Sequence, residues 1–216
     1  MNFPFGTIKC VTLPAVCNTK KAFPSYRGYF FVYLCAIMKK FILLSALFLA
    51  QVHRIMCQEP LSYDTIINRG WYQSYFNQAH STVSFVRYQL YKGGGTVKRK
   101  GMTWSHTVGD RVFPYAHSGY DKGHLAPAQD FAWSRAAMLS TFDYCNALPQ
   151  APALNRGAWK KLETKVRMWS QSDTLSIECG GLSFDSKSKM VPKYFYKIVT
   201  RHQGRDTLVN IIYLNK

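Results

Sequence analysis

Acidic residues are scarce in this sequence, and their scarcity narrows the class of partner. The 216 residues contain 11 Asp and Glu against 28 Lys and Arg, which gives a formal net charge of +17 at pH 7. Residues 1–57 carry no acidic residue at all. A positive surplus of this size indicates a polyanionic partner, but charge alone does not separate an enzyme from a module that only binds.

Cysteine is rare after residue 57, where only Cys145 and Cys179 remain. Two cysteines cannot form the disulfide framework of a small secreted scaffold. One bridge between them can form in an oxidising compartment. The favoured interpretation is two buried thiols that pack as small apolar side chains.

Long apolar runs are confined to the start of the chain. From Met38 the sequence has a basic start, an apolar run over residues 41–52 and a polar exit, as in a secretory signal peptide. The run is short for a membrane span. We therefore interpret residues 1–37 as an upstream extension of doubtful standing and 38–57 as a signal peptide. The expected location is secreted or periplasmic, with membrane anchoring by an uncleaved segment as the alternative.

Residues 58–216 show the patterns of one folded domain. Segments 71–76 and 83–91 alternate apolar and polar side chains around a polar turn, which predicts a β-hairpin. Further strands are predicted over 142–150 (a short strand that ends at a proline), 174–184, 193–200 and 207–214. Amphipathic patterns predict a short helix over 132–140 and a longer one over 153–171. Together these predict an α+β fold, with a mixed and mainly antiparallel sheet.

The segment GYDKGHLAPAQD, residues 119–130, places several reactive groups together. His124 is a candidate general base, because an imidazole accepts protons near neutral pH; a hydrogen-bonded structural histidine is the alternative. Gly123 permits close backbone approach. Asp121 could orient the turn or the imidazole, and Lys122 supplies a cation for a phosphate.

A second segment, residues 145–163, holds oxygen ligands near the start of the longer helix. Asn155 is predicted either to cap that helix or to bind a hard cation such as Mg²⁺ through its amide oxygen. Glu163 follows eight residues later, about 80° around an ideal helix. It can reach the same site through water, although the spacing alone favours a solvated surface glutamate. Trp159 is predicted to lie in the core.

Three ordered segments, DKGHLAPA, NALPQ and LNRGAWKKLE, resemble the DNA/RNA non-specific endonuclease family. The resemblance implies a ββα-metal (His-Me finger) site, in which a strand pair presents His124 as the base. It also implies that Asn155 binds Mg²⁺, or Mn²⁺ in its place, directly. Glu163 would act through metal-bound water, and Asn146 would make hydrogen bonds in the site.

The resemblance also concerns the cations of the site. Lys122 stands where the family more often has arginine, so a bidentate phosphate contact becomes a point charge. For the family's upstream arginine we predict Arg99, with Lys98 and Arg111 as alternatives. Cys145 stands where the family often has serine.

The expected function is therefore metal-dependent cleavage of DNA and RNA with little sequence preference. The alternatives are a non-catalytic nucleic-acid-binding module and a nuclease toxin with a cognate protein inhibitor. A zinc nuclease of the HNH type is disfavoured, because no close group of His and Cys ligands accompanies His124. The sequence does not predict the oligomeric state.

Overall fold

The computed structural model describes residues 60–216, except 188 and 202–204. The predicted upstream extension and signal peptide lie outside the described residues. Within the described part of the chain, no helix is long and apolar enough to cross a membrane.

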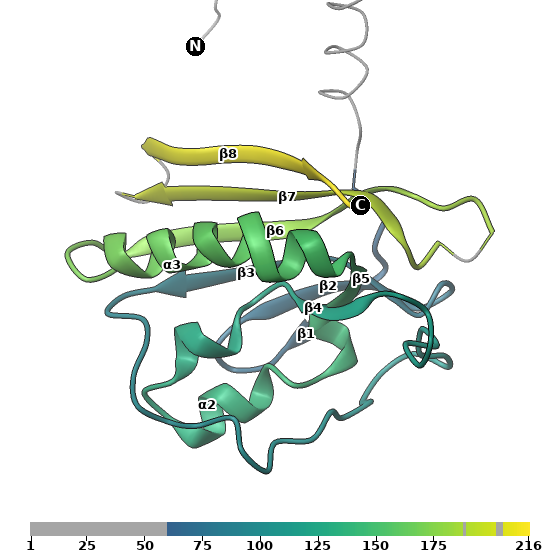
Figure 1. Cartoon of the computed structure of the whole chain (residues 1–216), viewed down its shortest axis with the longest axis horizontal. Helices are drawn as coiled ribbons and strands as arrows, with labels where there is room; N and C mark the ends of the chain where they lie inside the picture. Colours follow the sequence, from purple (N-terminus) through teal and green to yellow (C-terminus); the bar gives the residue numbers. More distant parts are fainter. Residues whose placement is uncertain (1–59, 188, 202–204) are drawn as a thin grey trace, which may run out of the picture. The chain divides into compact units, whose positions relative to one another are not determined.

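A six-stranded antiparallel sheet forms the centre of the described domain (Figure 1). Its strand order is β1-β2-β3-β6-β7-β8. The strands are β1 (Thr65–Asn68), β2 (Gln73–Asn77), β3 (Thr82–Leu90), β6 (Leu175–Phe184), β7 (Pro192–Arg201) and β8 (Asp206–Leu214). The predicted hairpin is confirmed as β2 and β3, and the three C-terminal strands are confirmed as β6, β7 and β8. Strand β1 was not predicted.

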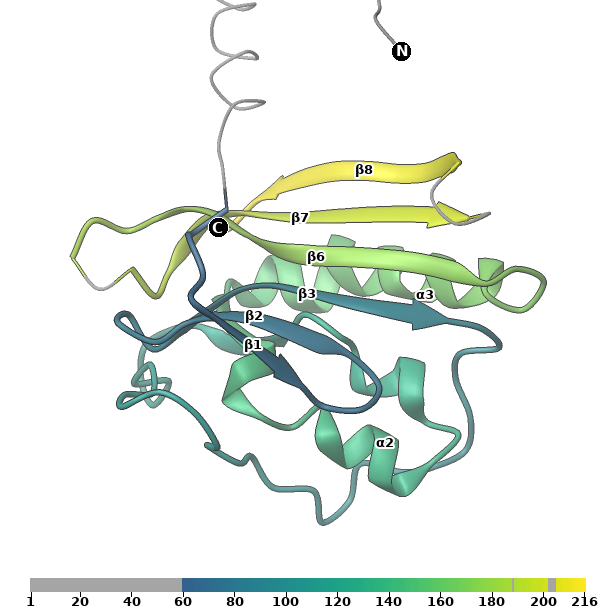
Figure 2. The same ribbon diagram turned by 180° about the vertical axis from the view of Figure 1, so that it is seen from behind.

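The two faces of the sheet differ in what covers them. On β3, Val86, Tyr88 and Leu90 are buried, whereas the alternating Arg87 and Gln89 are exposed. Side chains that alternate along a strand point to opposite faces, so the buried set faces the helical layer. Figure 2 shows helix α3 (Lys160–Trp169) behind the sheet, against that buried face. Burial of these apolar side chains is the main contribution to the stability of the domain.

A second, two-stranded sheet lies on the helical side of the large one. It pairs β4 (Asp121–His124) with β5 (Ala147–Gln150), with His124 opposite Ala147. The strand predicted over 142–150 is only partly correct, because residues 144–146 form the 3-10 turn η2 (Tyr144–Asn146). The strand also contains Pro149 instead of ending at it. Proline lacks an N–H group, and β5 tolerates it because its only partner in the described part is β4.

The predicted helices are present with shifted bounds. The short helix is α2 (Arg135–Ser140); it begins three residues later than predicted, because Ser134 caps it by accepting from the Ala137 N–H. A 3-10 turn, η1 (Ala128–Phe131), precedes it. The long helix begins with the π-helical segment η3 (Leu154–Trp159) and continues as α3, which ends at Trp169.

Cys145 and Cys179 are both free and buried. The structure therefore excludes the bridge and confirms the interpretation as packed thiols. Burial raises the pKa of the Cys145 thiol to about 12 and that of Cys179 to about 11. Both side chains stay protonated and unreactive near neutral pH.

Candidate active site

A cavity of about 640 Å³ opens between β4, η1 and the start of the long helix. It is lined by Arg99, Trp104, Asp121, Lys122, His124, Pro127, Ala128, Gln129, Phe142, Asn155, Arg156, Lys160, Glu163 and Arg167. Six of the seven site residues predicted from the sequence are in this set. The exception is Asn146. Among the described residues that line this cavity, Asp121 and Glu163 are the only acidic ones, against five Lys and Arg.

His124 ends β4 with its ring packed between two aromatic side chains. The centroid of the imidazole lies 4.8 Å from that of Trp104 and 4.9 Å from that of Phe142. Burial lowers the pKa of His124 to about 3; the positive charge of Arg99 also lowers it, and a hydrogen bond with the Lys122 backbone opposes the shift. The Nε2 atom is buried and has no hydrogen-bond partner among the described residues. His124 is therefore a neutral imidazole with a free ring nitrogen at the cavity.

This environment predicts that His124 stays neutral under mildly acidic conditions. Because desolvation disfavours the charged form, its ring signals should not titrate between pH 5 and 8 in the metal-free protein. The measurement is an NMR pH titration of ¹³C-labelled histidine, with the His124 signals assigned by their loss in His124→Ala. A His124 midpoint near 6.5, the ordinary value for histidine, would show that the ring is solvated.

Asn155 does not cap the helix, so that interpretation is wrong. It lies inside η3, where its own N–H donates to the Ala151 carbonyl, and the residue at the N-cap position is Ala153. Its side-chain Nδ2 donates to Asp121 Oδ2 at 2.9 Å. An ionised carboxylate can only accept, and only the NH₂ end of an amide donates, so this bond fixes the orientation of the amide. No described residue donates a hydrogen bond to the oxygen Oδ1, so it is left free on the wall of the cavity.

Asp121 holds Asn155 and does not orient the imidazole. Its carboxylate accepts two hydrogen bonds from Arg156, at 2.8 Å from Nε and 2.6 Å from Nη2. These bonds hold the pKa of Asp121 below its usual range, with the Asn155 bond acting in the same direction. The bidentate pair keeps Asp121 ionised and in place beside the Asn155 amide.

The π-helical segment brings Glu163 to the same cavity as Asn155. In an ideal helix, eight residues separate the two side chains by about 80°. A π-helical turn accommodates roughly one extra residue, so eight residues advance as seven do, and the offset becomes about 20°. The helical path is also interrupted at Gly157, which has φ −103° and ψ −109°. Glu163 therefore lines the cavity and is not a solvated surface glutamate, which was the reading favoured by spacing alone.

Exclusion of water raises the pKa of Glu163 to about 7. The nearby positive charge of Lys197 lowers it, and the negative charge of Asp130 raises it. A carboxyl group with this pKa can bind or release a proton under ordinary conditions.

Asn146 does not line the cavity. Its buried side chain accepts from the Ala126 N–H at 2.8 Å and donates to the carbonyls of Ala126 and Thr141, each at 2.9 Å. Backbone groups occupy both the oxygen and the nitrogen of the amide, so it cannot serve as a metal ligand. It fixes instead the turn that follows His124.

Gly123 is required for the close approach of β4 and β5. A Cβ atom at this position would lie 2.5 Å from Gln150 Oε1 and 2.6 Å from Gln150 Cβ. Even alanine would therefore push the two strands apart and displace the neighbouring His124.

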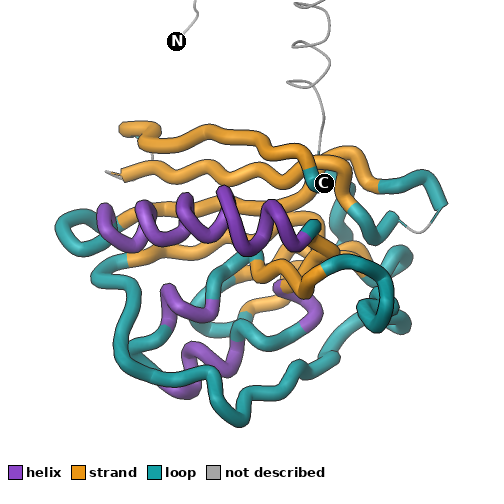
Figure 3. The backbone as a smooth tube through the Cα atoms, viewed as in Figure 1, coloured by secondary structure: helices purple, strands orange, loops and turns teal. Residues whose placement is uncertain are grey.

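The connection between β3 and β4, residues 91–120, contains no regular helix or strand (Figure 3). It brings Arg99 to the cavity, whereas Lys98 does not line it and Arg111 lines a separate small cavity. Of the three candidates for the family's upstream arginine, Arg99 is therefore the best placed. The connection is anchored by Asp143, which accepts hydrogen bonds from Ser105 and Thr107.

The sequence did not predict that Trp104, Arg156, Lys160 and Arg167 line the cavity. Arg167 donates to the buried Asp130 at 2.7 Å, and Asp130 also accepts from the Tyr88 hydroxyl. Arg167 follows Glu163 by four residues, so helical spacing was a usable signal for it. Trp104 and Arg156 depend on contacts across the fold that no local pattern predicts.

The oxygen groups of the cavity suit a hydrated hard cation. No group of three His, Cys, Asp or Glu side chains that could hold a metal is present among the described residues. A zinc site needs such a group. Mg²⁺ prefers oxygen ligands and retains most of its waters, so the free Asn155 Oδ1, with Glu163 within reach through water, fits Mg²⁺.

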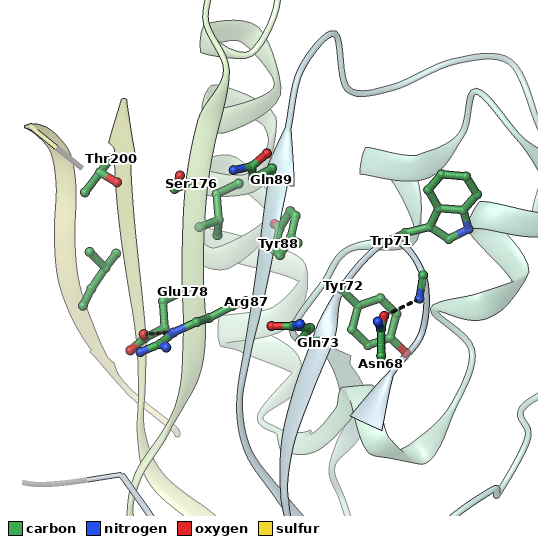
Figure 4. A pocket seen from close by; sticks show the side chains of 13 residues that line it. Asn68, Trp71, Tyr72, Gln73, Arg87, Tyr88, Gln89, Ser176, Glu178 and Thr200 are labelled. Atoms are coloured by element: carbon green, nitrogen blue, oxygen red, sulfur yellow. Dashed lines mark hydrogen bonds and ion pairs between the residues drawn. The ribbon is translucent and has the colours of Figure 1, made fainter. Parts of the chain in front are cut away.

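A second cavity, of about 550 Å³, lies on the outer face of the large sheet (Figure 4). Its side chains include Trp71, Gln73 and Gln89, together with Arg87 and Glu178. These last two form an ion pair with 2.7 Å between Nε and Oε2. No histidine is among the described residues that line this cavity, so it lacks the imidazole that the first cavity holds.

Comparison with known proteins gives consistent matches to nucleases. A family model described as DNA/RNA non-specific endonuclease matches residues 55–215. Human mitochondrial endonuclease G is 36% identical over 102 residues, covering 39% of this chain and 34% of that protein. A nuclease from Nostoc sp. is 34% identical over 152 residues, covering 65% of this chain and 55% of that protein. The chain thus spans about a third and about half of the lengths of these two relatives.

The fold is similar to that of a solved nuclease. The crystal structure of the EndoG/EndoGI complex contains a chain that matches with a TM-score of 0.59. The match covers 71% of this chain and 75% of that chain, at 19% sequence identity. The predicted α+β fold with its ββα arrangement is confirmed.

Proposed function

Because the chain belongs to the DNA/RNA non-specific endonuclease family, we propose that it is a metal-dependent endonuclease that hydrolyses phosphodiester bonds in both DNA and RNA. The observation that carries this proposal is the cavity itself. It combines the neutral His124, whose Nε2 is free, with the free Oδ1 of Asn155, among five Lys and Arg side chains.

The cations of the cavity would bind the phosphate backbone. Arg99 and Lys122 reach the cavity from the β3–β4 connection and from β4, and Arg167 reaches it from α3. Contacts to phosphate fix the position of a strand without reading its bases. This arrangement supports cleavage with little sequence preference.

His124 would activate the attacking water. A free ring nitrogen on a neutral imidazole can accept the proton of that water. A phosphodiester anion bound beside the ring favours the protonated form, so the pKa of His124 rises in the complex and proton acceptance becomes easier.

Asn155 would hold Mg²⁺ through Oδ1, with Asp121 and Arg156 fixing its amide. When bound, the ion supplies positive charge that stabilises the leaving oxygen. Glu163 would accept a hydrogen bond from a water in the ion's hydration shell. Mn²⁺ is the expected substitute, because it also prefers oxygen ligands.

The test is incubation of the purified protein with supercoiled plasmid and with single-stranded RNA, in Mg²⁺ or in EDTA. We expect both substrates to be degraded in Mg²⁺ and spared in EDTA. His124→Ala, purified in parallel, controls for contaminating nucleases. Binding of both substrates without cutting at every Mg²⁺ and Mn²⁺ concentration would instead identify a binding module.

We also propose that the protein is exported from a start at Met38, as its basic and apolar N-terminal pattern predicts. Expression of the full chain should give a secreted or periplasmic protein that lacks residues 1–37. N-terminal sequencing of that protein measures this directly. A mature protein that retains residues upstream of Met38 would refute the proposed start.

A further inference from the structure

The ammonium group of Lys122 is surrounded by three aromatic rings, which we call the Lys122 cage. Its Nζ lies 5.3 Å from the ring centroid of Trp104, 5.7 Å from Tyr115 and 5.2 Å from Tyr144. Each distance is within the range in which a ring face attracts a cation. Trp104 and Tyr115 come from the β3–β4 connection, and Tyr144 comes from η2.

The rings of the cage are stacked on one another. Tyr144 stacks with Trp104 at 5.3 Å and 28°, and with Tyr115 at 6.0 Å and 22°. The backbone holds together the segments that carry Trp104 and Tyr144, because the Tyr144 N–H donates to the Ser105 carbonyl and the Ser105 N–H donates to the Phe142 carbonyl. The fold itself therefore positions two of the three rings.

Lys122 differs from Arg156 and Arg167 in how it is held. Arg156 and Arg167 are each paired with a carboxylate, which neutralises much of their charge. Lys122 forms no ion pair with any residue that the structure describes. A lysine ammonium on a flexible four-carbon stem is otherwise poorly positioned. The rings restrict the ammonium and leave its full charge available at the cavity.

We propose that Trp104, Tyr115 and Tyr144 are positioning residues, which hold the Lys122 ammonium where it meets a phosphate of the bound strand. This inference rests on the proposed function, because it assigns Lys122 to the phosphate backbone. The cage replaces the geometric constraint that a bidentate arginine would provide. Lys122 contacts the phosphate in the ground state and the transition state alike, so a loosened cage raises KM and leaves kcat unchanged.

Tyr144→Leu removes one ring face and keeps an apolar side chain. With a short single-site DNA oligonucleotide, we expect KM to rise about two- to fivefold, the usual contribution of one exposed cation–π contact. Tyr144→Phe should restore the wild-type KM, because a phenyl face holds a cation without the hydroxyl. Tyr91→Leu is the matched control: Lys92 lies 5.3 Å from that ring, which does not line the cavity.

A double-mutant cycle separates the cage from an effect on the fold or on a stacked base. In a Lys122→Met background, Tyr144→Leu should raise KM no further, because the cation it positions is gone. The same rise in both backgrounds would overturn the inference, as would a Tyr144→Phe protein as impaired as Tyr144→Leu.

A spectroscopic measurement tests the cage without any cleavage. In protein with ¹³C-labelled lysine, the Lys122 Hε signals should be shifted upfield by the ring currents, and Tyr144→Leu should move them back. Lys122→Arg assigns these signals by removing them. If the wild type cuts no nucleic acid, the proposed function fails while this spectrum still tests the cage. If the wild type cuts normally and Tyr144→Leu leaves KM unchanged, the cage inference fails alone.

Discussion

His124→Ala should cut DNA and RNA roughly two to four orders of magnitude more slowly than the wild type, because that is the usual contribution of a general base. Its affinity for DNA should be nearly unchanged, since Arg99, Lys122 and the other cavity cations remain. Truncation removes the ring's hydrogen bond with the Lys122 backbone and its contacts with Trp104 and Phe142, so a thermal unfolding curve is needed to show that the variant is folded. Initial rates under saturating Mg²⁺ and a binding titration in EDTA measure the two effects.

The control for this substitution is His80→Ala. His80 lies in the turn between β2 and β3 and does not line the cavity. It should cut at the wild-type rate. A folded His124→Ala protein with full activity would remove His124 from the mechanism.

Asn155→Ala should also lose most activity at limiting Mg²⁺, but its defect should differ in kind. It removes the one protein oxygen proposed to hold the ion directly, so excess Mg²⁺ or Mn²⁺ should restore much of the rate. The measurement is the cleavage rate as a function of metal concentration. The Asn155→Ala curve should shift to higher concentrations, whereas His124→Ala should show a lowered plateau with little shift.

Asn155→Asp provides a second variant for the same position. It keeps an oxygen but loses the Nδ2 donor and places a carboxylate against Asp121, which accepts the present bond at 2.9 Å. Like charges at this distance repel, so the new carboxylate should turn away from Asp121. Full activity of Asn155→Ala at limiting Mg²⁺ would exclude Asn155 as the ligand.

The sequence predicted the residues that lie in short, chemically distinctive segments. His124 and Lys122 are on one four-residue strand, so their proximity needed only local spacing. The hairpin of β2 and β3 was predictable for the same reason. The alternation of apolar and polar side chains in two adjacent segments, with a polar turn between them, predicts that these segments pair.

The features that the sequence did not predict depend on contacts between distant segments or on the π-helical segment η3. Strand β1 is four residues long and gains its structure from pairing with β2. Arg156 was missed because its partner, Asp121, lies 35 residues earlier. The helical spacing favoured a solvated surface position for Glu163 because it assumed 3.6 residues per turn, which does not hold across a π-helical segment. Asn146 was assigned to the site from the family resemblance, but backbone groups occupy its amide.

The most direct test of the central claim is a crystal structure of the protein soaked in Mn²⁺, with anomalous scattering used to locate the ion. We expect one Mn²⁺ in the cavity, at coordination distance from Asn155 Oδ1, with the remaining ligands mostly water and with Glu163 joined to the ion through one of them. His124 should face this ion across the space for a phosphate. Mn²⁺ bound only elsewhere on the protein, with Asn155 Oδ1 free of metal at concentrations that support cleavage, would contradict it.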